Sequence, residues 1–250
     1  MCGRYALKCS PEELAKLFPE ISGPLDRLIG NGRYNIAPSQ PVVAVRTSEP
    51  GMCAPELNAP EWDVFEWGLV PSWIRDARPE HRPINARSEE AAGKPYFRGA
   101  MRHRRCLIPA TGFYEWERRG PQRQPYFFYR EDRQPFAMAG LWENWLAPDG
   151  SELLSCAILT TQANGLLSDL HHRMPVILPP ERHAAWLFPE RLKPREATQL
   201  CQPASTAGWT RHAVSTRVNS AREEGPELIE PTEATIAREL DFLDQLFNDN

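Results

Sequence analysis

Cys2 has the most distinctive chemistry of any residue in this sequence, because it directly follows Met1. If Met1 is removed, Cys2 carries a thiol and a free α-amine on adjacent carbons. Both groups titrate near pH 8 and are partly nucleophilic at neutral pH. Such an aminothiol condenses with aldehydes: the amine forms a Schiff base, and the thiol closes a five-membered thiazolidine. Position alone is also compatible with an N-terminal nucleophile that attacks a carbonyl, or with an ordinary small residue.

Polar side chains interrupt the segment Ile84–Glu89. If this segment is extended, Asn85 and Arg87 share one face. Asn85 would offer hydrogen-bond donors and an acceptor, and Arg87 a fork that fits phosphate. A helix N-terminus with local hydrogen bonds is the alternative.

Glu115 stands between Tyr114 and Trp116 in a stretch typical of a β-strand. Alternation places it on the same face as Phe113, which favours burial, although a solvent-facing position stays open. A buried carboxyl group has a raised pKa and can exchange protons near neutrality.

Two adjacent histidines, His171 and His172, precede Arg173. An imidazole there could act as an acid or base near pH 7, and Arg173 could contact a phosphate. The alternative is a pair of surface histidines at a helix end. Without a third ligand they make a poor metal site, and we predict no metal or cofactor. Together these residues form an inventory for carbonyl chemistry beside a phosphate.

The elements that must position these residues are short and numerous. Ser10, Pro11 and Glu13 form a helix start with a capping box, which would anchor the Cys2 segment to the core. Strands are predicted over 41–46, 62–67, 106–109, 112–117, 126–130, 136–142, 153–161, 174–178 and 209–215, and helices over 88–92, 98–105, 162–170, 180–187 and 194–200. We therefore predict an α+β fold, with one domain of many short strands in a curled or barrel-like sheet and peripheral short helices.

The longest predicted helix, residues 232–248, follows this domain. It carries Ile236, Leu240, Leu243 and Phe247 on one face. We expect this face to dock on the body, and contact with a partner is the alternative. The predicted organisation is one domain over residues 1–231 and an appended C-terminal helix over 232–250.

Composition narrows the classes of function. The chain has 250 residues, of which 41% are hydrophobic and 25% charged, as in ordinary globular proteins. No run of about 18 apolar residues predicts a membrane span, and no apolar segment after Met1 predicts secretion. We therefore expect the protein to stay inside the cell, in the cytoplasm. The six cysteines form no C-x-x-C pair, which argues against a structural zinc site or a disulfide framework.

Charge gives a mixed indication about nucleic acid. The net charge of −4 argues weakly against such a partner. However, 25 of the 29 basic residues are Arg, which binds phosphate and stacks on bases better than Lys. Acidic residues gather toward the C-terminus, so the remainder of the chain is closer to neutral or basic.

As a set, these motifs resemble the SRAP family (SOS-response-associated peptidases, or abasic site processing proteins). The matching stretches run in order through residues 1–231: 1–5, 34–40, 67–73, 85–89, 106–116, 139–142, 171–178 and 214–219. The resemblance implies binding to single-stranded DNA that contains abasic (AP) sites. It also implies that Cys2, once Met1 is lost, forms a stable thiazolidine cross-link with the AP-site aldehyde.

The resemblance also implies the roles of particular residues. Cys2, Asn85, Glu115 and His171 match the active positions of the family, with His171 rather than His172 chosen by its spacing to Arg173-Met174-Pro175. Arg4, Arg87 and Arg173 would contact phosphates, and Trp67, Trp73 or Trp116 would stack on bases. Self-processing of Met1 and AP-lyase activity are further expectations.

Two other functions compete with this interpretation. An N-terminal-nucleophile amidohydrolase, such as a class II glutamine amidotransferase, also begins Met-Cys-Gly, and release of ammonia from glutamine would identify it. A non-covalent single-stranded-DNA-binding module would leave Cys2 inert, and its complex with DNA would not survive a denaturing gel.

Overall fold

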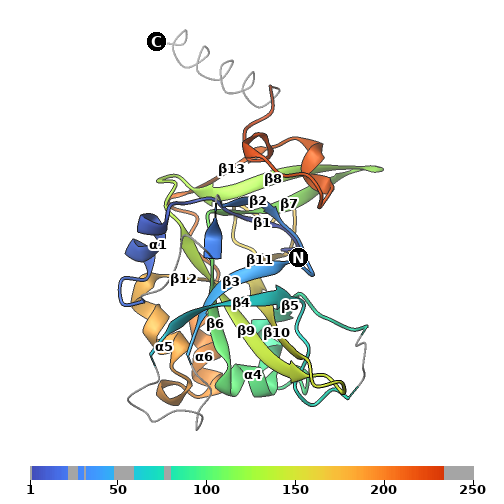
Figure 1. The fold of residues 1–250 in the computed structure, drawn as a ribbon. Coiled ribbons are helices and arrows are strands. Elements are labelled where there is room, and N and C mark those ends of the chain that lie inside the picture. The colour runs from blue at the N-terminus through green and yellow to red at the C-terminus, as the bar shows by residue number, and fades with distance from the viewer. Residues whose placement is uncertain (1, 22–27, 31, 48–58, 76–79, 234–250) are drawn as a thin grey trace.

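A computed structural model describes residues 2–21, 28–30, 32–47, 59–75 and 80–233 (Figure 1). Its strands form two sheets, with short helices at the periphery. The strands are β1 (Tyr5–Leu7), β2 (Arg33–Ile36), β3 (Pro41–Arg46), β4 (Glu61–Trp67), β5 (Asn85–Arg87), β6 (Arg105–Ala110), β7 (Gly112–Arg119), β8 (Gln122–Arg130), β9 (Phe136–Leu146), β10 (Glu152–Gln162), β11 (Arg173–Pro175), β12 (Ile177–Leu178) and β13 (Trp209–Ala213). The α-helices are α1 (Pro11–Leu17), α3 (Ser88–Ala91), α4 (Arg98–His103), α5 (His183–Leu187) and α6 (Pro194–Leu200).

The larger sheet curls on itself. Its strand order is β11-β10-β4-β3-β6-β9-β12, and β10 also pairs with β9. The strands β9, β10, β4, β3 and β6 therefore close into a barrel. Strand β5 lies parallel to β10, with Asn85 opposite Ile158. This closure confirms the predicted α+β domain with a barrel-like sheet.

The smaller sheet holds the N-terminal segment. Its order is β13-β8-β7-β1-β2, and all its pairs are antiparallel. Strand β1 lies between β7 and β2, with Tyr5 opposite both Phe113 and Ile36. In Figure 1 the N-terminus lies between the two sheets. A strand of three residues is thus placed centrally, where neither of its edges is left unpaired.

Local sequence signals predicted several elements well. Strand β3 has the predicted bounds, and α1 carries the predicted capping box: the N–H of Ser10 donates to Glu13 at 2.7 Å, and the N–H of Glu13 donates to the Ser10 hydroxyl at 3.3 Å. This helix packs on the core through Leu14, which is fully buried.

Two local predictions were wrong. A helix was predicted over 162–170, but Gln162 ends β10 and residues 165–170 form turns. The Asn164 carboxamide competes with helical bonding there, because it accepts from the N–H of Leu166 and donates to the carbonyl of Ala204. The strand predicted over 174–178 is split, because Val176 passes from β10 to β9: its N–H donates to Leu159, and its carbonyl accepts from Ala139.

Gly112 begins β7 at the point where this strand meets β1. A Cβ atom there would lie 2.1 Å from Cζ of Phe127 and 2.7 Å from the Phe128 carbonyl oxygen. We expect Gly112→Ala to lower the free energy of unfolding by about 1–3 kcal/mol through overpacking, measured by urea denaturation. Gly165→Ala is the matched control, because its nearest neighbour would be 4.0 Å away. Equal midpoints for the two variants would contradict the prediction.

The predicted C-terminal helix lies outside the described residues from residue 234 onward. Within the described part of the chain, no helix has both the length and the apolar character needed to cross a membrane.

Candidate functional site

Cys2 lies at the junction of the two sheets and is fully buried. Its strand is held on the β7 side by the N–H of Tyr114, which donates to the Arg4 carbonyl at 3.0 Å. Burial raises the pKa of the Cys2 thiol to about 12, and the negative charge of Glu115 contributes in the same direction. The thiol is therefore protonated at neutral pH, and it needs a base before it can act as a nucleophile.

Asn85 holds the Cys2 backbone from the side of the larger sheet. Its Nδ2 donates to the Cys2 carbonyl at 2.8 Å. Its Oδ1 is buried and has no hydrogen-bond partner among the described residues. An unpaired buried amide oxygen is costly, so it is suited to accept from a group that arrives with a ligand. The segment is extended, so Asn85 and Arg87 share one face of the strand as predicted. Asn85 is buried and Arg87 is exposed.

Glu115 is 3% exposed, so its side chain is buried rather than directed to solvent. Strand β7 places it one residue beyond Tyr114, whose backbone pairs with the Cys2 segment. Burial raises the pKa of the Glu115 carboxyl group to about 7. At neutral pH the carboxyl is therefore divided between its two protonation states, so it can both donate and accept a proton.

His171 is fixed as a neutral imidazole. The N–H of Arg173 donates to its Nδ1 at 2.9 Å, and the Arg173 carbonyl lies 3.2 Å from the same nitrogen. Because a backbone N–H can only donate, the shorter contact leaves the ring proton on Nε2. Burial lowers the pKa of His171, and the positive N-terminal amine acts in the same direction. His172 stacks on this ring, with 4.4 Å between the ring centroids.

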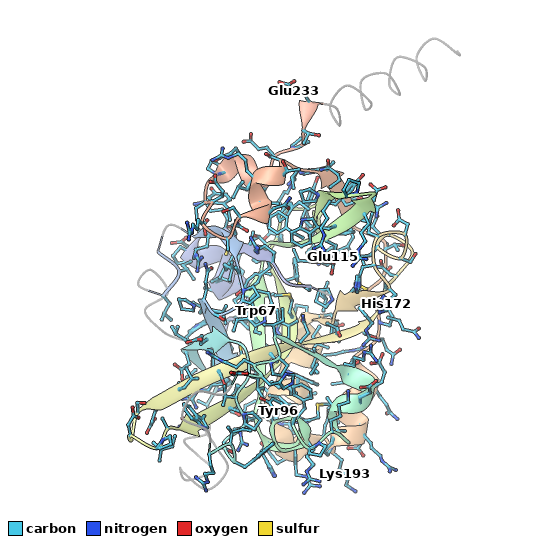
Figure 2. All side chains as sticks on the ribbon, turned by 90° about the vertical axis from the view of Figure 1, so that its right-hand side faces the viewer. Trp67, Tyr96, Glu115, His172, Lys193 and Glu233 are labelled. Atoms are coloured by element: carbon cyan, nitrogen blue, oxygen red, sulfur yellow. The ribbon has the colours of Figure 1, made fainter. Side chains whose placement is uncertain are left out.

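Figure 2 looks onto the right-hand side of Figure 1 and shows how these groups are arranged. Glu115 belongs to the smaller sheet, His172 lies slightly below it, and Trp67 lies toward the middle of the molecule. The structure thus brings Cys2 together with Asn85 through a hydrogen bond and with Glu115 through electrostatic influence.

The three arginines expected to bind phosphate differ in how firmly other groups of the protein hold their guanidinium groups. Arg87 is exposed, and its ion pair with Glu90, at 3.1 Å, is a surface pair. Arg173 is 7% exposed and is held by both carboxylate oxygens of Glu89, at 2.9 and 2.7 Å, and by the Thr160 carbonyl at 2.6 Å. Arg4 is half-buried, and its Nη1 donates to two protein oxygens at 2.7 Å. Only Arg87 has a guanidinium that can turn to an incoming phosphate without breaking buried bonds.

The three tryptophans expected to stack on bases also differ. Trp67 is fully buried, packs against the Tyr5 ring and donates to the Ile84 carbonyl at 2.8 Å, so it belongs to the core. Trp73 is 54% exposed and packs edge-on against Tyr96, which lies well below Glu115 in Figure 2. Trp116 is half-buried, and its indole N–H donates to Asn219 at 2.6 Å. Trp116 is the stacking candidate next to the site.

The segment 218–224 borders the site, but the sequence assigned it no role, although residues 218 and 219 fall within a matching stretch of the family resemblance. Its contacts come from Asn35 of β2, from Arg4 and from Trp116. Asn35 stands within a matching stretch of the family resemblance, but no pattern assigned it a role.

The candidate site is separate from a cleft of about 540 Å³. This cleft is lined mainly by α1, by β12 and the residues after it, and by the segments 134–136 and 202–205, and none of the candidate residues lines it. Among the described residues, no group of three potential metal ligands is found.

The comparisons with known proteins agree with this geometry. The family model described as SOS response associated peptidase (SRAP) matches residues 1–221, and the chain belongs to this family. Abasic site processing protein YoqW of Bacillus subtilis is 36% identical over 235 residues, which cover 92% of this chain and 99% of that protein. Abasic site processing protein YedK of Escherichia coli is 33% identical over 240 residues, covering 92% and 100%. A crystal structure of a protein from Bacteroides thetaiotaomicron superposes with a TM-score of 0.78 at 27% identity, covering 92% of this chain and 100% of that chain.

Proposed function

We propose that this protein captures abasic sites in single-stranded DNA as a covalent thiazolidine on Cys2, which shields the lesion during the response to DNA damage. The observation that carries the proposal is the placement of Cys2: its carbonyl is held by Asn85, and its thiol is electrostatically coupled to a carboxyl group that titrates near pH 7. The names of the relatives, abasic site processing proteins, support the same substrate.

The first steps expose the aldehyde and form the Schiff base. The Nε2–H of His171 donates a hydrogen bond to the ring oxygen of the closed sugar. That oxygen takes the proton of the C1′ hydroxyl, relayed by a solvent water, and the ring opens to the aldehyde. After loss of Met1, the Cys2 amine adds to C1′ and gives a carbinolamine. Protonated Glu115 donates to the hydroxyl, which leaves as water, and a Schiff base forms.

The thiol completes the adduct. Because its pKa is raised to about 12, the thiol must lose its proton as it attacks. The Glu115 carboxylate produced in the previous step accepts that proton and is restored to its protonated form. A C–S bond forms at C1′, and the nitrogen of the protonated Schiff base becomes the neutral N–H of the ring. In sum, an aldehyde and an aminothiol give a thiazolidine and one water.

Two further activities follow from the same groups. A Schiff base that is not closed by the thiol permits β-elimination and strand cleavage, which is an AP-lyase outcome. Removal of Met1 by the protein itself would be a peptidase reaction at the same Cys2. We include both in the proposal.

The decisive experiment is intact mass spectrometry of the purified protein with and without an AP-site oligonucleotide. We expect a protein mass without Met1, and an adduct equal to protein plus DNA minus one water that survives denaturation. A complex that disperses on denaturation would favour the non-covalent DNA-binding module. Ammonia release from glutamine would favour the amidohydrolase.

Arg87 provides a test of the DNA-binding part of the proposal. Its ion pair with Glu90 lies on the surface and contributes little to stability, so a phosphate can replace it. Arg87→Ala should weaken binding to single-stranded DNA and reduce the slope of log affinity against log salt by about 0.7. Fluorescence anisotropy over a salt series measures both. Lys193→Ala is the control, because Lys193 lies at the far end of the molecule from Glu115 (Figure 2). An equal loss of affinity in both variants would show that Arg87 does not contact the DNA.

A further inference from the structure

Asn35 is a fully buried amide on β2, the edge strand of the smaller sheet that pairs with β1. Its Oδ1 accepts from Arg4 Nη1 at 2.7 Å, and its Nδ2 donates to the carbonyls of Ser220 at 2.9 Å and Glu223 at 2.8 Å. Both amide hydrogens and the amide oxygen are therefore used. Such a saturated buried group fixes the relative positions of the segments that it joins.

Arg4 extends this connection toward Cys2. The same Nη1 that contacts Asn35 also donates to the Val218 carbonyl at 2.7 Å. The Arg4 carbonyl accepts from the N–H of Tyr114 at 3.0 Å and from the Cys2 thiol at 3.8 Å. Both the side chain and the backbone of Arg4 are thus held, only two residues from the reacting amine and thiol.

The segment 218–224 also reaches the other side of the site. Asn219 accepts from the indole of Trp116 at 2.6 Å, and Trp116 directly follows Glu115. A single segment therefore contacts the neighbours of both Cys2 and Glu115, and Asn35 anchors it.

We propose that Asn35 is a positioning residue, which acts through Arg4 to hold Cys2 in line with Glu115 and the aldehyde. This inference rests on the proposed function. It assigns Arg4 to the placement of the nucleophile rather than to a phosphate. Misplacement of a reacting group by about 1 Å can slow a reaction by about 100-fold, so the loss of this anchor should slow capture more than it weakens binding.

The test separates binding from chemistry. Binding is measured with an oligonucleotide containing a tetrahydrofuran abasic analogue, which has no aldehyde and cannot cross-link. Capture is measured as the rate of adduct formation at saturating AP-site DNA. For Asn35→Ala we expect a capture rate about 10- to 100-fold lower and unchanged affinity for the analogue. A role of Arg4 at a phosphate predicts the reverse, with weaker binding and an unchanged rate at saturation.

Glu224→Gln is the matched control. Glu224 ties the same segment to β2, by accepting from the N–H of Tyr34 at 2.9 Å and from Arg33 at 3.2 Å, but it makes no contact with Arg4. This variant should capture at the wild-type rate. A loss equal to that of Asn35→Ala would show that only the general stability of the segment matters, and would overturn the proposal.

Asn35→Asp provides the rescue and guards against a misfolded Asn35→Ala. Asp keeps an oxygen for Arg4, but it sets its second oxygen against the carbonyls of Ser220 and Glu223 in place of the two amide donors. We expect its capture rate to lie between those of Asn35→Ala and the wild type. A folded Asn35→Asp that captures no faster than Asn35→Ala would contradict positioning through Arg4. If the wild-type protein forms no adduct, the proposed function fails; if it does and Asn35→Ala matches it, only the positioning role fails.

Discussion

Replacement of Cys2 by Ala should reduce the durable adduct with an AP-site oligonucleotide below detection on a denaturing gel. The variant keeps an α-amine at the same position, so it can still form a Schiff base, but it has no thiol to close the ring. Borohydride reduction should therefore still trap a cross-link. Strand cleavage should increase, because the open Schiff base survives long enough for β-elimination.

Cys9→Ala is the matched control, since Cys9 is a half-buried thiol in the same N-terminal region. It should form the adduct at the wild-type rate. Intact mass must first establish that Met1 is absent from each variant, because the free α-amine otherwise belongs to Met1 and not to residue 2. A Cys2→Ala protein that cross-links stably without reductant would contradict the assignment of Cys2 as the residue that forms the adduct.

Glu115→Gln should slow capture at pH 7 by about 100- to 10,000-fold, the range for loss of a general acid–base group. The substitution preserves size and removes the proton exchange on which both water loss and thiol attack depend. The wild-type rate should show an inflection near pH 7, where the Glu115 carboxyl group titrates, and the variant should lack it. Rates of adduct formation at saturating DNA between pH 5 and pH 9 provide the measurement.

The same substitution should stabilise the fold at alkaline pH. The pKa of Glu115 rises from an ordinary 4.5 to about 7 on folding, so the folded state binds more protons than the unfolded state between these values. Stability is therefore lost as pH rises through this window, by about 3 kcal/mol in total. Glu115→Gln should have a higher Tm than the wild type at pH 8, and the difference should shrink at pH 5.

Glu117→Gln is the control for both effects. Glu117 lies on the same strand and is half-buried, and it accepts from the Tyr126 hydroxyl at 3.1 Å. It should leave the capture rate and the inflection near pH 7 unchanged. If this control loses the inflection, or Glu115→Gln keeps it, the titrating group is not Glu115.

The sequence predicted the elements whose determinants are local. The capping box of α1 needs only Ser10, Glu13 and the turn between them, and β3 needs only its own run of β-branched residues. The chemistry of Cys2 also follows from its place in the chain, since an amine and a thiol on adjacent carbons react with aldehydes in any fold. The α+β class followed from many short strand signals separated by turns.

Only the tertiary structure decided which of the long side chains are buried and which are exposed. Arg87 and Arg173 have the same side chain, yet one is exposed and the other is enclosed by Glu89 and Thr160. Trp67 and Trp116 belong to similar aromatic motifs, yet one is in the core. These outcomes depend on partners up to about two hundred residues away in the chain, as with Arg4 and Val218, and no local pattern encodes such a contact. The burial that sets the Glu115 pKa arises in the same way, from packing between strands that are distant in sequence.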